Sequence, residues 1–273
     1  MGANGPQKVG LPMYDPPELH STVDAWWNGL SRAIRAEGVE DVPDELDRNL
    51  SLDALWGAPD LLLTQTCGYA LTGRWASRLQ YLATPRHAAA GCNGSSYCSW
   101  IVVAADSRAR GLEDLRGARC SINQRISHSG YNALRALIAP LARDGRFFAS
   151  VSESGGHAES LAQLGQGEVD VAAIDCVTHA LLLRCRPHLI AATRIIGRTP
   201  PAPGLPYATR HDASPGLVRK LRAALARASH DPNLRAVRAE LLITGFDVLP
   251  LGSYACMAQM EAEAKRQGYF ELD

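Results

Sequence analysis

Blocks of apolar residues alternate with polar segments along the chain, and the spacing inside each block predicts its secondary structure. Short runs rich in Val, Ile and Leu, bounded by Gly, Pro or polar residues, indicate buried strands. These predicted strands are 8–13, 61–65, 99–105, 119–123, 169–175, 189–196 and 206–210. Apolar residues that recur every three or four positions indicate helices with one buried face. These predicted helices are 20–38, 131–142, 157–167, 215–229, 232–243 and 253–268.

Strands that alternate with helices predict an α/β fold with mostly parallel sheets. The chain has 273 residues, enough for one large domain or for two lobes. Two extended segments are candidate crossings between lobes: "GSSYCSWIVVAAD" and the proline-rich "GRTPPAPGLPYATR". They predict one discontinuous lobe formed by residues 1–103 plus 207–273, and a second lobe formed by residues 104–206.

Composition and charge favour a globular protein and argue against nucleic-acid binding and membrane insertion. Apolar residues make up 46% and charged residues 21%, which is typical of a globular protein with a proper core. Lys plus Arg equals Asp plus Glu at 28 each, and this balance argues against a nucleic-acid binder. No apolar run is long enough to insert into a membrane. The N-terminus lacks the basic-then-apolar plan of a secretory signal, so two locations stay open: cytoplasmic if Met1 is the native start, periplasmic if an export signal was removed.

The seven cysteines form neither a CxxC motif nor a Cys/His cluster with zinc spacing. We therefore expect reduced thiols, no metal site and no cofactor. One alternative remains open, because Cys92 and Cys98 are close enough in sequence to form a disulfide that closes a loop.

Polar residues follow several predicted strands, at the points where helices are predicted to begin. Ligands of α/β sheets bind beyond the carboxyl ends of the strands, so these junctions are candidate site segments. The junctions are "LLLTQTCGYAL" with Thr66, "SINQRISHSGYNAL" with Ser127, Ser129 and Gly130, "VSESGGHAESLAQL" with His157, and "VDVAAIDCVTHALL" with Asp175.

The segment Ser127–Gly130 is the most informative junction. A helix start has free backbone N–H groups and a partial positive charge, so it attracts anions. Its serines can hold an oxyanion, or one of them can be an ordinary N-cap. The same choice applies elsewhere: His157 can be a helix-capping or surface residue, and Asp175 can cap the helix that follows it.

Six motifs, in this order, resemble the phosphate/phosphite/phosphonate-binding proteins of ABC importers. They cover most of the chain from residue 8 to about 210, and are "LPMYDPPE", "TQTCGYAL", "YLATPRHAAAGCNGSSYCSWIVV", "SINQRISHSGYNALR", "FFASVSESGGHAESLAQLGQGEVDVAAIDCVT" and "LPYATR". The resemblance implies a two-lobed periplasmic-binding-protein type II fold with two crossing strands and a central cleft. It also implies a non-catalytic receptor that binds a small phosphorus oxyanion and works with an importer permease.

The resemblance also implies which residues bind the ligand. The family's serine-rich turn, histidine and acidic strand end correspond to Ser127, Ser129, His157 and Asp175, and tyrosine-bearing segments correspond to Tyr14 and Tyr69. His128 stands where the family usually has a third hydroxyl residue. Asp175 can accept the proton of a P–OH group while repelling an anion that has none, such as sulfate.

Two other functions stay open at this point. The protein can be a cytoplasmic module that senses an anion and reports to a protein partner. It can also be a hydrolase, because Ser127 or Ser129, His157 and Asp175 occur in the order Ser, His, Asp. The absence of a GxSxG motif argues against the hydrolase.

Overall fold

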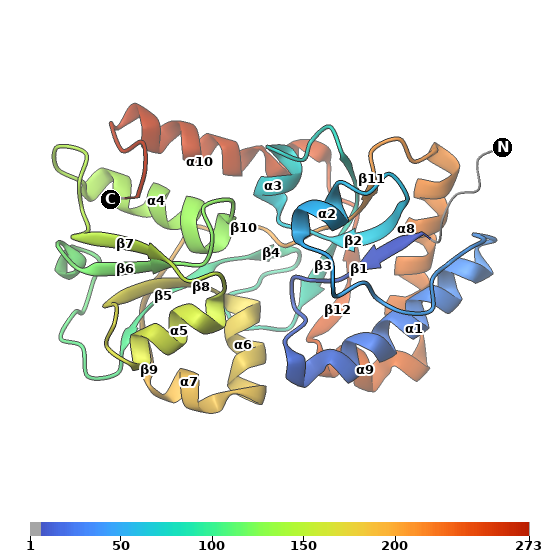
Figure 1. Cartoon of the computed structure of the whole chain (residues 1–273), viewed down its shortest axis with the longest axis horizontal. Helices are drawn as coiled ribbons and strands as arrows, with labels where there is room; N and C mark the ends of the chain where they lie inside the picture. The colour runs from blue at the N-terminus through green and yellow to red at the C-terminus, as the bar shows by residue number, and fades with distance from the viewer. Residues whose placement is uncertain (1–6, 273) are drawn as a thin grey trace. The chain divides into compact units, whose positions relative to one another are not determined.

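A computed structural model describes residues 7–272 of the chain. The chain folds into two compact units, each with its own sheet and helices (Figure 1). Unit 1 contains the residues up to Ala88 together with Pro203–Ser253. Unit 2 contains Ala89–Ala202 together with the residues from Tyr254 onward.

These units differ from the predicted lobes mainly in two segments, residues 89–103 and the residues from Tyr254 onward. Residues 89–103 belong to unit 2, because β5 (Ser99–Ala104) pairs with two strands of that unit. The C-terminal residues from Tyr254 also belong to unit 2, because α10 (Ala255–Arg266) packs against a helix of that unit. The chain therefore passes between the units three times, after Ala88, Ala202 and Ser253.

Unit 1 is built on a five-stranded sheet with the order β1-β2-β11-β3-β12. The strands are β1 (Lys8–Gly10), β2 (Leu61–Gln65), β3 (Leu79–His87), β11 (Tyr207–Arg210) and β12 (Ile243–Asp247). The helices are α1 (His20–Ala36), α2 (Leu52–Trp56), α3 (Gly68–Thr72), α8 (Pro215–His230) and α9 (Arg235–Glu240), with short 3-10 turns η1 (Pro17–Leu19) and η5 (Pro232–Leu234).

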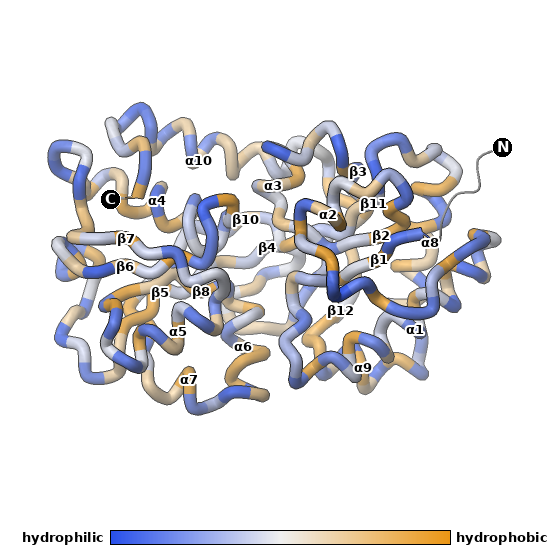
Figure 2. Tube along the Cα trace, in the orientation of Figure 1, coloured by the Kyte–Doolittle hydropathy of each residue, from blue (hydrophilic) through white to orange (hydrophobic). Residues whose placement is uncertain are grey.

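Helix α1 supplies a large part of the core of unit 1. Its predicted apolar face is buried as expected, and Trp26 and Trp27 are each only 1% exposed. Figure 2 shows hydrophilic and hydrophobic residues alternating along α1. The helix packs against α8 and α9, and α8 in turn contacts β3 and β12.

Unit 2 is built on a second five-stranded sheet with the order β7-β6-β8-β5-β9. Its other strands are β6 (Arg119–Ile122), β7 (Ser150–Glu153), β8 (Val171–Asp175) and β9 (Thr193–Arg198). Its helices are α4 (Ala133–Ile138), α5 (His157–Gly165), α6 (Cys176–Cys185), α7 (Pro187–Ala191) and α10, with short turns η2 (Glu113–Leu115), η3 (His128–Asn132) and η4 (Ala139–Leu141). A separate two-stranded sheet joins β4 (Ser96–Tyr97) and β10 (Ala202–Pro203), and the turn η6 (Leu251–Tyr254) precedes α10.

The central strands β5, β6 and β8 of this sheet are mostly buried, whereas the edge strands β7 and β9 are partly or largely exposed. Successive side chains of a strand point to opposite faces, so a buried strand contributes to two cores. In Figure 1, α4 and α10 cover one face and α5, α6 and α7 cover the other. Ile101 and Val103 of β5 pack into the first core with Leu134 of α4. Val102, between them, packs into the second core with Leu161 of α5.

Both sheets are mixed, whereas the sequence pattern predicts mostly parallel ones. β1–β2, β6–β7 and β6–β8 are parallel. The pairings of β11, β12 and β5 with their neighbours are antiparallel. β5 and β11 each follow a passage of the chain between the units, and each runs antiparallel to both of its neighbours in the sheet.

One predicted strand begins as a helix. The run 189–196 was expected to be extended, but Pro187–Ala191 forms α7 and only Thr193–Arg198 forms β9. Proline at the first helical position favours this start, because its missing N–H would have no partner within the helix anyway. Between residues 7 and 272, no helix combines the length and the hydrophobicity that crossing a membrane requires.

Candidate functional site

The strand ends of unit 2 gather polar side chains at one edge of its sheet. β6, β7 and β8 run parallel, so their carboxyl ends lie at the same edge. Asn123 directly follows β6, Ser154 directly follows β7, and Asp175 is the last residue of β8. This is the edge at which ligands of α/β sheets bind.

The serine segment forms a tight turn at this edge. Ser127 is the N-cap of η3, a single π-helical turn, and its Oγ accepts a hydrogen bond from the Gly130 N–H at 3.2 Å. The Ser127 and Ser129 hydroxyl oxygens lie 3.3 Å apart. Ser127 is therefore an N-cap, and the capped turn also places the hydroxyl groups of Ser127 and Ser129 next to each other.

His157 joins this turn from another element. It is the first residue of α5, and its Nε2 lies 2.9 Å from Ser129 Oγ. Gly155 precedes it with φ of +92°, a backbone conformation that residues with a Cβ rarely adopt. The Ser154 hydroxyl donates to the Ile122 carbonyl at 3.1 Å, and this bond fixes the loop against the end of β6.

The buried environment of His157 keeps its imidazole neutral at neutral pH. Burial lowers its pKa from 6.5 to about 4, because a charged ring would lose its hydration. A backbone hydrogen bond with Ala173 acts in the opposite direction and is the smaller effect. A neutral ring can donate a hydrogen bond through one nitrogen only, so its tautomer decides whether Ser129 donates or accepts.

His128, between the two serines, is only 2% exposed. Its Nδ1 lies 3.2 Å from Asn132 Nδ2, and its ring lies 6.4 Å from the Tyr97 ring between centroids. Asn132 Nδ2 also donates to the Met257 carbonyl at 2.9 Å. Burial lowers the pKa of His128 to about 4. Its predicted role in ligand binding stays a prediction.

Gly130 is required by close packing within the turn. A Cβ at this position would lie 2.1 Å from Asn123 Oδ1 and 3.3 Å from the Asn123 backbone nitrogen. Asn123 Oδ1 is buried and has no hydrogen-bond partner among the described residues. Any side chain at position 130 would push Asn123 aside.

Asp175 caps helix α6, which is the other interpretation given for it above. Its Oδ1 accepts hydrogen bonds from the N–H groups of Val177 at 2.7 Å and Thr178 at 3.0 Å. The side chain is 1% exposed. The turn η3 contacts β8, so this carboxylate and the serine turn belong to the same edge of the sheet.

The structure thus joins Ser127, Ser129 and His157 in one chain of hydrogen bonds. Asp175 ends a neighbouring strand and caps α6, and the backbone partner of His157 is Ala173. The Ser/His/Asp relay of a hydrolase is therefore incomplete in this geometry. Among residues 7–272, no group of three or more His, Cys, Asp or Glu side chains could hold a metal ion.

The other predicted residues lie in unit 1. Thr66 directly follows β2, is fully buried, and its Oγ1 has no hydrogen-bond partner in the described part of the chain. Tyr69 lies in α3, two residues after the N-cap Cys67. Because Thr66 also stands where a strand ends and a helix begins, its hydroxyl is a candidate donor to a ligand.

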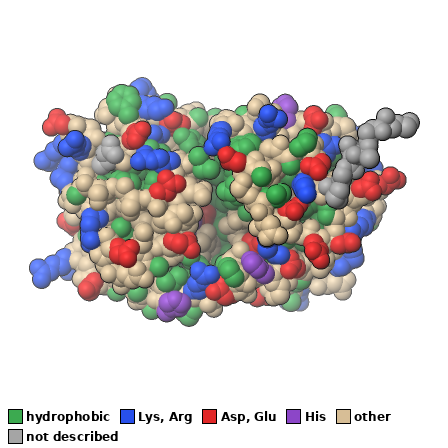
Figure 3. All heavy atoms as spheres, viewed as in Figure 1, with side chains coloured by type: hydrophobic (Ala, Val, Ile, Leu, Met, Phe, Trp, Pro, Cys, Tyr) green, Lys and Arg blue, Asp and Glu red, His purple; other side chains and the backbone are tan. Residues whose placement is uncertain are grey.

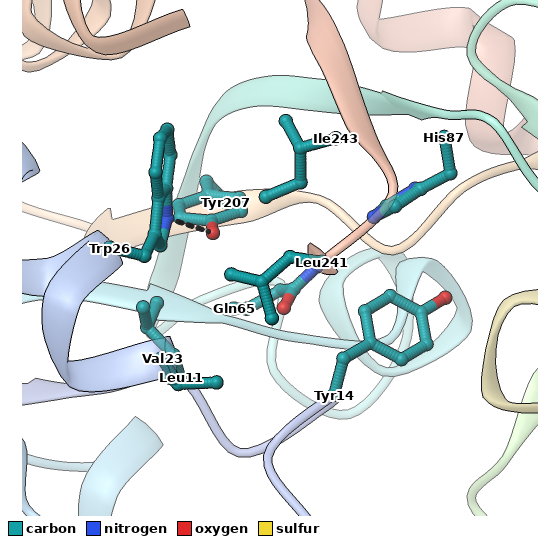
Figure 4. Close-up of a pocket in the computed structure, with 9 residues that line it drawn as sticks. All are labelled: Leu11, Tyr14, Val23, Trp26, Gln65, His87, Tyr207, Leu241 and Ile243. Carbon is teal, nitrogen blue, oxygen red and sulfur yellow. Dashed lines mark hydrogen bonds between the residues drawn. The ribbon is translucent and has the colours of Figure 1, made fainter. Parts of the chain in front are cut away.

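Tyr14 lines a pocket of unit 1 (Figure 4). Its ring meets the His87 ring edge-on, with 5.3 Å between centroids. On the other side of the pocket, Trp26 Nε1 donates to the Tyr207 hydroxyl at 3.0 Å. No carboxylate is among the lining residues, which are Leu11, Tyr14, Val23, Trp26, Gln65, His87, Tyr207, Leu241 and Ile243.

Two polar residues at the edge of the unit 2 sheet were not singled out in the sequence. Asn123 follows β6, and Thr199 follows β9 and accepts a hydrogen bond from the Ser99 N–H through its Oγ1 at 2.9 Å. The sequence signal was the same for both residues: each is the first polar residue after a strand.

The face of the molecule seen in Figure 3 shows Lys and Arg side chains mixed with Asp and Glu side chains.

The buried histidines predict a loss of stability in acid. The folded-state pKa of His157 is about 4, below its ordinary value of 6.5, so the unfolded chain binds the proton more tightly. The stabilisation is complete above pH 6.5 and is lost as the pH falls towards 4. We expect His157 alone to reduce the unfolding free energy by about 2 kcal/mol between pH 7 and pH 5.

Urea denaturation at pH 7, 6 and 5 measures this loss. The His157→Gln variant keeps a polar group near Ser129 but has no titrating group at position 157. Its unfolding free energy should therefore fall by about 2 kcal/mol less between pH 7 and pH 5 than that of the wild type. Equal pH dependence in the wild type and the variant would contradict a neutral, buried His157.

Comparison with known proteins places this geometry in context. The sequence profile of the family described as ABC transporter, phosphonate, periplasmic substrate-binding protein matches residues 10–250. No curated protein sequence matches the chain.

Solved structures share the fold at low identity. A binding protein component of an ABC phosphonate transporter from Pseudomonas aeruginosa is 16% identical, with a TM-score of 0.75 over 96% of this chain and 87% of that chain. PhnD1 from Prochlorococcus marinus, in complex with methylphosphonate, is 15% identical, with a TM-score of 0.74 over 95% and 98%. XAC2383 from Xanthomonas citri, bound to ATP, is 18% identical, with a TM-score of 0.70 over 96% and 98%. The likeness confirms the periplasmic-binding-protein fold class predicted from the sequence.

Proposed function

Because this chain belongs to the family of periplasmic substrate-binding proteins of phosphonate ABC transporters, we propose that it binds a small phosphorus oxyanion. The ligand is a phosphonate, phosphite or phosphate, and the residues that bind it in unit 2 are Ser127, Ser129, His157 and Asp175. In this proposal the loaded protein delivers the anion to an importer permease and carries out no chemistry on it.

The chain of hydrogen bonds from Ser127 through Ser129 to His157 is the observation that carries the proposal. An oxyanion needs several donors that converge on its oxygens. Two adjacent hydroxyl groups and an imidazole at one sheet edge supply such donors. In the free protein they satisfy one another, and an anion can replace these mutual contacts with stronger, charge-assisted ones.

Two helix starts support the anion electrostatically. α5 begins at His157 and α6 begins directly after Asp175. Each start carries a partial positive charge and favours a negative ligand. A bound anion also favours the charged form of His157, so its pKa should rise on binding and a proton should be taken up below neutral pH.

Asp175 gives the site its selectivity in this proposal. Its Oδ1 accepts the hydrogen bonds that cap α6, and in this proposal the carboxylate also accepts the proton of the ligand's P–OH group. A singly protonated oxyanion satisfies this acceptor. Sulfate has no proton at neutral pH and meets the carboxylate with repulsion only.

The hydrolase alternative receives less support from the geometry. Ser129 and His157 are within hydrogen-bond distance, as a nucleophile and its base must be. However, the backbone partner of the imidazole is Ala173, whereas the carboxylate of Asp175 caps α6. We therefore assign this pair to binding.

Titration calorimetry with phosphite, phosphate, methylphosphonate and sulfate tests the proposal. The protein is first unfolded, dialysed and refolded, so that any bound anion is removed. We expect at least one phosphorus oxyanion to bind about tenfold or more tightly than sulfate. The Asp175→Asn variant, which keeps the oxygen that caps α6, should bind that oxyanion more weakly and reject sulfate less.

Equal affinity of the wild type for sulfate and all three phosphorus compounds would overturn the proposed selectivity. Absence of binding to any of the four would overturn the assignment of the anion class. For Tyr14, Tyr69, Thr66, His128 and Gly130, a role in binding is part of the same proposal, and alanine variants of the first four in the same assay test it.

A further inference from the structure

Three cysteines of unit 2 lie together beside the N-terminus of α6. Cys92 Sγ is 3.6 Å from Cys176 Sγ, and Cys98 is the third member of the group. All three are free thiols. The structure does not contain the disulfide between Cys92 and Cys98 that the sequence left open, and the Cys92 thiol contacts Cys176.

The fold positions Cys98 and Cys176 opposite each other. Ser99 of β5 pairs with Asp175 of β8, so the residues just beyond this pair face each other as well. The Cys176 N–H donates to the Cys98 carbonyl at 3.1 Å. This anchor holds the start of α6 against the segment that leads into β5.

Gly91 allows the loop to bring Cys92 against this pair. Its φ is +94°, and a Cβ there would lie 3.0 Å from both Cys176 Cβ and Cys98 Sγ. Only a glycine fits both the backbone conformation and the space. The loop is thus shaped to place the Cys92 thiol on the buried Cys176.

The two thiols differ in exposure and in acidity. Cys92 is half-buried, whereas Cys176 is fully buried. The hydrogen bond with Cys176 lowers the pKa of the Cys92 thiol. The same hydrogen bond and burial raise the pKa of Cys176. Cys92 is consequently the member that ionises first and that a reagent reaches first.

We propose that Cys92 and Cys176 are a redox-active dithiol that closes to an intramolecular disulfide on reaction with a low-molecular-weight disulfide. The inference rests on the geometry of the thiol cluster and does not depend on the identity of the anion.

The reaction balances in two exchange steps. The Cys92 thiolate attacks the reagent RSSR, forms Cys92–S–S–R and releases one RS⁻. In this mixed disulfide, Cys92 can no longer accept a hydrogen bond as a thiolate from the Cys176 thiol. Cys176 can then transfer its proton to the released RS⁻. The Cys176 thiolate attacks Cys92 sulfur and releases the second RS⁻, which takes up a proton from water. Two protein thiols are oxidised, and one disulfide is reduced to two thiols.

Only a small movement is required for closure. The sulfur atoms must approach from 3.6 Å to the covalent distance of about 2 Å, which side-chain rotation can provide. The product would link the loop at Cys92 to the first residue of α6. Because a long segment separates the two cysteines, we expect the melting temperature to rise by about 5 °C or more.

Peptide mapping after oxidation tests the proposal. The reduced protein is incubated with oxidised glutathione, remaining thiols are blocked with N-ethylmaleimide, and the digest is analysed by mass spectrometry. We expect a linked peptide pair that contains Cys92 and Cys176 and is lighter by two hydrogens. Cys92→Ser should lack this pair, and Cys98→Ala should keep it.

Four outcomes would overturn the proposal: a link between Cys92 and Cys98, a link between Cys98 and Cys176, a stable glutathione adduct on Cys92, or no change at either Cys92 or Cys176. Thiol blocking without oxidant, followed by circular dichroism, checks that each variant is folded. If Cys98→Ala does not fold, peptide mapping of the wild type alone still shows which two of the three cysteines are linked.

Discussion

Replacing Ser129 by alanine is expected to weaken binding of the preferred phosphorus oxyanion about ten- to a hundredfold. The Ser129 hydroxyl lies between Ser127 Oγ and His157 Nε2, so it is the central group of the proposed anion site. Its loss removes one hydrogen bond to a charged ligand, worth about 1.5–3 kcal/mol. Calorimetry with phosphite and methylphosphonate measures the change.

Ser152→Ala is the matched control. Ser152 is an exposed residue of β7 in the same unit, so its replacement should leave the affinity unchanged. Ser127→Ala is expected to lower the affinity as well, and also to destabilise the turn by about 1 kcal/mol because it removes the cap on Gly130. If Ser127→Ala and Ser129→Ala both bind the anion as tightly as the wild type, the serines have only a structural role and do not bind the ligand.

Replacing Tyr269 by alanine is expected to lower the unfolding free energy of unit 2 by about 3–5 kcal/mol. Tyr269 is fully buried and packs in the same core as Leu134 and Val171. Removing a large buried ring costs its transfer free energy and leaves a cavity. Chemical denaturation followed by circular dichroism measures the loss.

The neighbouring residue supplies the comparison. The side chain of Phe270 is 64% exposed, so Phe270→Ala should cost little. Its backbone carbonyl, which accepts a hydrogen bond from buried Arg135 at 2.8 Å, is untouched by the substitution. Equal effects of the two replacements would contradict the packing of the C-terminal segment into unit 2.

The sequence pattern predicted the strand before the serine turn, but it did not predict β7, the strand before His157. The grouping of the two segments was implied by the family resemblance, and the shared sheet edge explains it. Carboxyl ends of parallel strands share an edge, whatever the length of chain between them. The orientation of His128 was not predictable in this way. Its ring contacts Asn132 and Tyr97, and which side of a one-turn helix faces those partners depends on tertiary packing.

β3, the longest strand of unit 1, gave no clear signal. It contains Pro85, which usually argues against a strand inside a sheet. Here Pro85 faces Phe246 of β12, and β3 still pairs on both sides. β11 pairs with residues 79–83 and β12 with residues 84–87, so Pro85 has a neighbouring strand on one side only, and such edge positions tolerate proline.

The C-terminal helix shows the limit of periodicity. The pattern of residues 253–268 predicts a helix with a buried face, and α10 forms there. Periodicity does not say which element covers that face. Assigning it to the lobe that contains the N-terminus was therefore an extrapolation, and the contact of α10 with α4 assigns it to unit 2.

The three passages of the chain between the units determine when each core can be completed. Unit 1 needs β11 and β12, and unit 2 needs Tyr269 and Leu272, which follow β12 in the chain. Neither core can therefore close while most of the chain is still being made. During synthesis, the incomplete polypeptide exposes unpaired strand edges and apolar side chains. Chains in this condition aggregate or bind chaperones.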